Sequence, residues 1–119
     1  MAAAHEPQVL TVGDLEVRPH EGLVIAAGQV VPMSVREFGV LVALASRTGR
    51  IISREELYEH VWGSRLRDGD RSIDVYVHKV RSKLEEALPE WRFIHTHVGF
   101  GYRFSPEVSH AFHNRATGT

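Results

Sequence analysis

Cationic side chains and one apolar side chain gather on one side of the segment between residues 71 and 87. At about 100° per residue, an apolar stripe also runs along this segment, which predicts a helix with the stripe facing the core. The stripe consists of Ile73, Val77, Val80 and Leu84, and the opposite side consists of Arg71, Val75, His78, Lys79 and Ser82, with Arg81 and Lys83 on its flanks. Arginine and lysine bind phosphate and guanine, and valine suits a thymine methyl. The pattern indicates a helix that reads the major groove of DNA, with a solvated surface face as the plainer alternative.

A hairpin predicted over residues 91–104 carries the second set of candidate contacts. Residues 91–96 favour a strand, residues 98–101 a turn and residues 102–104 the returning strand, and Pro106 is expected to close the element. Gly99 and Gly101 permit positive φ on both sides of Phe100, so this aromatic side chain is expected at an exposed tip. A basic helix followed by a hairpin has the order of a helix-turn-helix with a wing.

Several further elements must position this helix and hairpin. Short apolar runs separated by closely spaced turns predict a meander of antiparallel strands at the start of the chain. Capping boxes of the form Ser-x-x-Glu at Ser34 and Ser53 begin two helices, and Gly49 and Gly63 end them. The sheet is expected over residues 8–31, and the two helices over 34–48 and 53–62. A polar loop over 63–70 leads to the third helix over 71–87, with Asp70 as its N-cap. Residues 1–7 and 106–119 are expected to be flexible ends.

Composition limits the classes to which the chain can belong. Its 119 residues, 43% of them hydrophobic and 24% charged, suit one globular domain. The absence of cysteine excludes disulfides and thiolate metal ligands. No apolar run is long enough to span a membrane, and the first residues lack the pattern of a signal peptide, so a cytoplasmic location is expected. The net charge of −1 argues mildly against nucleic acid, but binding depends on where charges lie rather than on their sum.

No catalytic, cofactor or metal site is predicted, and the chain is expected not to be an enzyme. It has no phosphate-binding loop and no nucleophile elbow, and Gly99-x-Gly101 lacks the helix that a dinucleotide fingerprint requires. The pairs His95-x-His97 and His110-x-x-His113 resemble ligand spacings, but no carboxylate stands at ligand spacing beside them. The two tryptophans, Trp62 and Trp91, are expected to pack between elements rather than to stack on bases.

Four motifs in order along the chain resemble the winged-helix effector domain of OmpR/PhoB-type response regulators. These are Ser34–Phe38 with Leu41 and Leu44, Ile52–Leu57 with Val61–Gly63, Arg71–Leu84, and Gly99–Phe104. The resemblance implies an α+β fold, a winged helix-turn-helix with an N-terminal four-stranded antiparallel sheet, three helices and a C-terminal β-hairpin wing. The strands predicted over 8–31 agree with that leading sheet.

The resemblance also implies a sequence-specific transcriptional regulator of a two-component system. Such domains bind promoter direct repeats as a head-to-tail dimer, with the third helix in the major groove and the wing on adjacent backbone or in the minor groove. The DNA-binding positions that it implies are Arg71, Ser72, Val75, Tyr76, His78, Lys79, Arg81, Ser82 and Lys83 on the helix, and Thr96, His97, Phe100, Tyr102 and Arg103 on the wing. The loop before the third helix would contact RNA polymerase through Arg65, Leu66 and Arg67.

The wing departs from the family pattern at one position. Val98 stands where the family usually carries an arginine, so arginine insertion into the minor groove is not expected, and His97, Phe100 or Arg103 would substitute. The chain has no room for a receiver domain, so we expect either an excised C-terminal domain or a stand-alone regulator. The alternative function is a winged-helix module that binds a partner protein instead of DNA. The near-neutral net charge and the absence of the family's arginine from the wing favour that alternative, whereas the basic face of the third helix with Val75 favours DNA.

Overall fold

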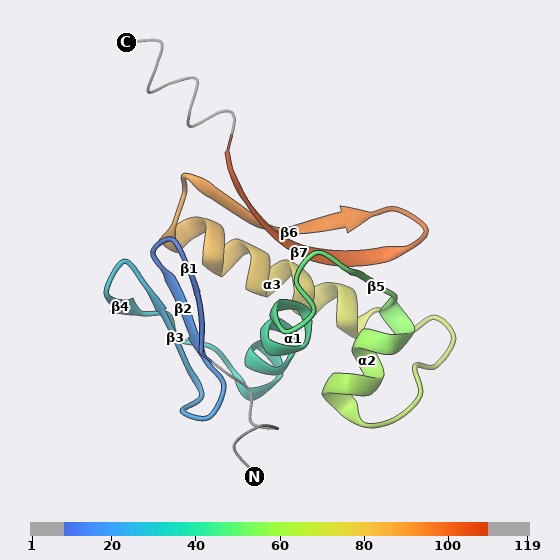
Figure 1. The fold of residues 1–119 in the computed structure, drawn as a ribbon. Coiled ribbons are helices and arrows are strands. Elements are labelled where there is room, and N and C mark those ends of the chain that lie inside the picture. Colours follow the sequence, from blue (N-terminus) through green and yellow to red (C-terminus); the bar gives the residue numbers. More distant parts are fainter. Residues whose placement is uncertain (1–8, 110–119) are drawn as a thin grey trace, which may run out of the picture.

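The N-terminal part of the chain forms a four-stranded antiparallel sheet (Figure 1). The computed structural model describes residues 9–109. The strands β1 (Leu10–Val12), β2 (Leu15–Arg18), β3 (Leu23–Ala26) and β4 (Gln29–Val30) pair in chain order. Alternate side chains of β2 and β3 are buried, as the side-chain period of a strand with one covered face requires. The predicted meander is therefore confirmed.

Two capped helices follow the sheet, and their ends differ from the prediction. The helix α1 (Val35–Ala45) begins with the complete capping box of Ser34 and Glu37. It does not extend to residue 48, because the hydroxyls of Ser46 and Thr48 donate to carbonyls of its last turns, at 2.6 Å each, and residues 46–49 form a turn. The helix α2 (Arg54–Trp62) is capped by Ser53 alone. The second capping box is incomplete, since the Glu56 carboxylate lies 3.8 Å from His60 Nε2 instead of returning to the cap.

The third helix, α3 (Ser72–Ala87), lies at the centre of the domain. All four residues of the predicted apolar stripe are fully buried, namely Ile73, Val77, Val80 and Leu84. The N-cap position belongs to Arg71 rather than to Asp70. Asp70 still stabilises the start of the helix, because its carboxylate accepts hydrogen bonds from the Ser72 N–H at 2.8 Å and from the Ser72 hydroxyl at 2.6 Å.

The C-terminal hairpin is longer than predicted and belongs to a second sheet. This sheet has the order β5-β7-β6, with β5 (Ile51–Ile52), β6 (Trp91–His97) and β7 (Gly101–Val108). Pro106 does not end β7, because it lies at a register shift where the proline disturbs no regular ladder bond. Residues 106–109 are therefore not part of a flexible tail, and the remaining expectations for the chain ends, together with His110-x-x-His113, lie outside the described residues.

The core lies between the three helices, one face of the N-terminal sheet and the inner face of the second sheet (Figure 1). Phe93 and Phe104 stack at 5.9 Å within it, and Trp91 stacks on Phe93 at 5.8 Å. Trp91 also joins the two sheets, because an added Cβ at Gly13 would lie 2.7 Å from its ring. The α+β winged-helix fold is confirmed. Over residues 9–109, no helix has both the length and the apolar character needed to cross a membrane.

Candidate nucleic-acid interface

The outer face of α3 is defined here as the five residues Arg71, Val75, His78, Lys79 and Ser82. All five are exposed, and Val75 keeps 49% of its surface accessible in the middle of the set. This face lies opposite the fully buried stripe, as the helical period predicts. It therefore offers two permanent cations, two smaller polar groups and one apolar contact to solvent.

An aromatic stack supports one side of this face. Tyr58 and Trp62 of α2 stack with ring centroids 4.6 Å apart, and Trp62 meets Tyr76 of α3 edge-on at 5.5 Å. The Lys79 ammonium lies 5.0 Å from the Tyr76 ring centroid, and the Arg36 guanidinium lies 4.8 Å from the Trp62 ring centroid. Tyr76 is consequently half-buried and holds Lys79 over its ring by a cation–π contact. Trp62 packs between elements, as predicted.

Asp74 joins three elements at the start of α3. Its two carboxylate oxygens accept from Arg54 of α2 at 2.8 to 3.1 Å, and Oδ1 also accepts from the Tyr102 hydroxyl of β7 at 2.5 Å. Arg54 donates further to the Asp70 carbonyl at 2.9 Å. Burial alone would raise the pKa of Asp74, but the bonds from Arg54 and Tyr102 hold it below its usual value. Burial and the bond to Asp74 raise the pKa of Tyr102 to about 12.

A second bond ties α3 to the hairpin. Arg81 Nη2 donates to the Thr96 hydroxyl at 2.8 Å, and Thr96 is the cross-strand partner of Tyr102. The Nε of Arg81 is buried without a hydrogen-bond partner in the described part of the chain. Arg81 is thus engaged with the wing and does not project freely from α3. Tyr102 is 8% exposed with its hydroxyl bonded inside the domain, so the structure gives it a place within the fold and not on the surface.

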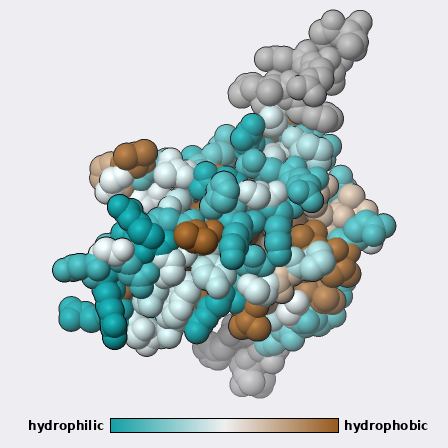
Figure 2. Space-filling view, turned by 180° about the vertical axis from the view of Figure 1, so that it is seen from behind, coloured by the Kyte–Doolittle hydropathy of each residue, from teal (hydrophilic) through white to brown (hydrophobic). Residues whose placement is uncertain are grey.

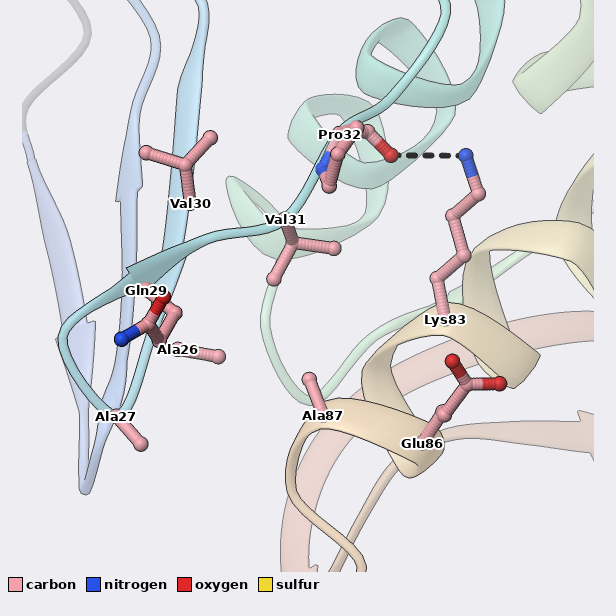
Figure 3. A pocket seen from close by; sticks show the side chains of 9 residues that line it. All are labelled: Ala26, Ala27, Gln29, Val30, Val31, Pro32, Lys83, Glu86 and Ala87. Atoms are coloured by element: carbon pink, nitrogen blue, oxygen red, sulfur yellow. Dashed lines mark hydrogen bonds between the residues drawn. The ribbon is translucent and has the colours of Figure 1, made fainter.

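Lys83 lies away from the outer face of α3, in a groove of about 420 Å³ between α3 and β4 (Figure 3). Its ammonium donates to the Pro32 carbonyl and to the buried Glu37 carboxylate, both at 2.8 Å. Burial alone would raise the pKa of Glu37, but the bond from Lys83 and the capping bonds hold it below its usual value. Lys83 therefore joins α3 to α1 and to the segment before it.

The tip of the hairpin is apolar and exposed. Val98 is 89% exposed and Phe100 is 73% exposed. Seen from the side opposite to Figure 1, the surface is largely hydrophilic, and one group of hydrophobic side chains lies at the hairpin tip, at left in this view, while a larger group lies at the right (Figure 2). Positive φ at Gly99 and Gly101, +84° and +139°, forms this turn as predicted. Behind the tip, His97 and Arg103 are half-buried, and Arg103 Nη2 lies 4.0 Å from Glu107.

The loop between α2 and α3 presents two cations. Arg65 and Arg67 are exposed, and Leu66 is half-buried beside a hollow that Glu55, Glu59 and Asp68 also line. Over residues 9–109, no three His, Asp or Glu side chains come together as metal ligands. His95 Nε2 lies 2.7 Å from the Ser105 carbonyl instead.

Arg54 and Asp74 are functional-site residues that the sequence patterns do not predict. Neither belongs to a periodic pattern, and they are separated by a helix and a loop, so only the tertiary fold brings them together. One signal was present, because Asp74 is an acidic residue in the first turn of a helix whose first three turns are otherwise basic. A carboxylate at that position is explained by its favourable interaction with the helix dipole, so the sequence gives no reason to expect a bond to Tyr102.

Comparison with known proteins agrees with this geometry. The family model described as "Transcriptional regulatory protein, C terminal" matches residues 28–104. The response regulator SaeR of Staphylococcus aureus strain USA300 is 36% identical over 101 residues, which are 84% of this chain and 44% of SaeR. The chain therefore spans less than half the length of that curated relative.

Two solved structures of DNA-binding domains are similar over nearly their whole length. The Klebsiella pneumoniae RstA DNA-binding domain, solved in complex with the RstA box, has a TM-score of 0.74 and 30% identity, and the match covers 83% of this chain and 98% of that chain. The DNA-binding domain of CpxR from E. coli has a TM-score of 0.70 and 31% identity, with 83% and 97% covered.

Proposed function

The chain belongs to the family of C-terminal domains of transcriptional regulatory proteins, and we propose that it binds duplex promoter DNA as a winged helix-turn-helix domain of the response-regulator type. In this proposal α3 enters the major groove and the β6–β7 hairpin lies on adjacent backbone or in the minor groove. The activity is binding and includes no catalytic step. RstA, which is similar over 98% of its solved chain, supports the docking because it was solved on its DNA box.

The observation that carries the proposal is the outer face of α3. A helix that only met solvent would gain nothing from Val75 at 49% exposure between cations, whereas a valine there can contact a thymine methyl. Arg71 and Lys79 are separated by about 12 Å along the helix axis, which is close to the width of about 12 Å of the major groove. At this separation Arg71 can bind a phosphate at the edge of the groove while Val75 and Lys79 face the bases.

A salt titration tests this function directly. A DNA duplex that the chain binds is first selected from a random pool. The dissociation constant of the chain for this duplex is then measured between about 50 and 200 mM salt. We expect affinity to fall steeply with salt, and we expect Lys79→Ala to weaken binding. Arg18→Ala is the charge-matched control, since Arg18 lies on β2 and pairs with Glu16 and Glu21. Equal effects of both substitutions, or no selectable duplex at all, would contradict the proposal.

Two partners follow from the same proposal. We propose that two copies bind direct repeats head to tail, and that the loop between α2 and α3 contacts RNA polymerase. The exposed Arg65 and Arg67 support the second contact, because they lie outside the aromatic stack and outside the outer face of α3. The substitutions Arg65→Ala and Arg67→Ala should reduce transcription from a bound promoter without changing the DNA footprint. A weakened footprint would place the loop on DNA instead.

The second candidate function is a protein-binding module without DNA binding. The exposed apolar tip of Val98 and Phe100 favours it, since a hairpin tip that is apolar and carries no arginine suits a protein surface. The salt titration separates the two functions, because this candidate predicts no salt-dependent retention of any duplex.

A further inference from the structure

Two separate hydrogen bonds between side chains connect α3 to the hairpin. Asp74 accepts from the Tyr102 hydroxyl at 2.5 Å, and Arg81 donates to the Thr96 hydroxyl at 2.8 Å. Tyr102 and Thr96 are directly opposite each other on β7 and β6. Asp74 and Arg81 lie two helical turns apart, about 10 Å along the axis. The hairpin is thus held at two separate points on α3, which fixes its direction as well as its position.

Of the residues in these two hydrogen bonds, Asp74 also contacts a third element. Its carboxylate also binds the Arg54 guanidinium through both oxygens, and Arg54 holds the Asp70 carbonyl before α3. One side chain therefore contacts α2, α3 and β7. The Asp74 side chain is 25% exposed and the Arg54 side chain 30%, so these bonds are shielded from water more than surface ion pairs are.

We propose that Asp74 is a positioning residue, which through Tyr102 fixes the wing in the orientation where α3 and the wing contact one DNA site together. The inference rests on the proposed function and extends it. A wing held rigidly brings its contact to the DNA without a further loss of conformational freedom, whereas a wing that swings must be ordered on binding. The contribution of the wing tip to affinity therefore depends on the Asp74–Tyr102 bond, although neither residue touches DNA.

A role in stability alone predicts a different result. If the bond only stabilises the fold, its loss lowers the melting temperature but leaves the wing contribution unchanged at temperatures where the domain is folded. If the bond positions the wing, its loss reduces the effect of a wing-tip substitution and leaves the effect of an α3 substitution unchanged. Double-mutant cycles distinguish these cases, because they isolate the coupling between two residues.

The experiment uses the full chain and the selected duplex. Tyr102→Phe removes one hydroxyl, keeps the ring, and leaves Asp74 paired with Arg54. We expect it to weaken binding about 3- to 10-fold, within the range of coupling between residues in contact. We expect Phe100→Ala to weaken binding in the wild-type background and to have little effect in the Tyr102→Phe background. Lys79→Ala should have the same effect in both backgrounds.

Two further variants keep the test decisive. Thr96→Val removes the second point of attachment and should reduce the effect of Phe100→Ala in the same way, so a fold loss in Tyr102→Phe does not end the test. Tyr58→Phe is the matched control, because it removes a hydroxyl from the tyrosine stacked on Trp62 and leaves both hydrogen bonds to the hairpin intact. Additive cycles between Tyr102 and Phe100 would overturn the proposal, as would a Phe100→Ala variant with wild-type affinity. Failure of the wild-type chain to bind any duplex would instead contradict the proposed function.

Discussion

Arg71 and Lys79 are expected to contribute to DNA binding in different ways, because they occupy different places on the outer face of α3. The Arg71 side chain is 78% exposed at the N-cap, and Asp74, 3.8 Å away, is already paired within the domain. Lys79 lies about two turns further along and is held 5.0 Å from the Tyr76 ring centroid. We therefore expect Arg71 to bind a phosphate and Lys79 to reach base edges.

The expected magnitudes follow from these two environments. Each neutralised phosphate contributes about 0.9 to the slope of log affinity against log salt, so Arg71→Ala should flatten that slope by about one. Between about 50 and 200 mM salt, the advantage of the wild type over this variant should then shrink by about 3.5-fold. A base contact is worth about 1–3 kcal/mol, or about 5- to 150-fold in affinity. Lys79 should fall in the lower half of that range, because an ammonium cannot bind guanine through a planar fork.

The assay is a salt titration of each variant against the selected duplex and against duplexes that differ at single base pairs. Arg71→Ala should weaken binding to all of these duplexes by the same factor. Lys79→Ala should relax the preference at one base position and leave the other positions unchanged. The division of roles is refuted if both variants lose base preference equally, or if Arg71→Ala leaves the salt slope at its wild-type value.

Three further predictions concern the wing tip, the close packing at Gly101 and the pH dependence of stability. Val98→Arg should leave stability unchanged, because the side chain is 89% exposed. It should strengthen DNA binding and add a preference for A·T-rich flanks. Val30→Arg on β4 should change neither the affinity nor the preference. Gly101→Ala should lower the free energy of unfolding by more than the 1–3 kcal/mol or so of a strained φ, because its Cβ would lie 2.0 Å from a backbone oxygen of β5. Gly99→Ala, which meets no atom within 4 Å, should show the φ cost alone in the same denaturant titration. Glu37 has a lowered pKa, so the stability from its ionised form is present above about pH 4.3 and is lost as the pH falls further; Glu37→Gln should therefore show a smaller drop in melting temperature between about pH 6 and pH 3.

Local patterns in the sequence were sufficient to predict the three helices, the first sheet and the hairpin, and to predict which face of α3 is buried. The stripe at Ile73 and Val77 repeats at helical spacing, and burial follows directly from that period. The capping box at Ser34 is also local, since all of its bonds lie within four residues. By contrast, β5 has two residues, and it is a strand only because β7 lies beside it. No pattern within the chain marks so short a strand.

The candidate interface was predicted where it depends on one helix and not where it depends on contacts between elements. The exposed positions of Val75 and Lys79 follow from the helical wheel alone. The same wheel placed Arg81 and Lys83 on the flanks, where the tertiary fold determines which groups these side chains contact. Lys83 pairs with a carboxylate of α1, and Arg81 bonds to the hairpin. Long cationic side chains at flanking positions bind the nearest acceptor, and the position of that acceptor is a property of the assembled domain.

The net charge of −1 is a poor guide to this domain, because its charges are unevenly distributed and several acids lie in ion pairs away from the outer face of α3. Asp74 is paired with Arg54, Glu37 is paired with Lys83, and the Asp70 carboxylate accepts from the first turn of α3. The outer face of α3 contains no acid, and the acids of this helix beyond Asp74 lie in its last two turns. A phosphate at that face therefore meets Arg71 and Lys79 rather than the average charge of the chain.

The wing offers less charge than α3 to a DNA backbone. Its tip is Val98 and Phe100, and Arg103 behind the tip is half-buried and 4.0 Å from Glu107. An apolar tip adds little to the salt dependence of binding, because it releases no counterions. It contributes more through contact with sugar or base edges when its position is fixed before binding, which is the role that we propose for Asp74 and Tyr102. Sequence preference in this domain should accordingly reside mainly on α3, with a wing contribution that depends on how firmly the hairpin is held.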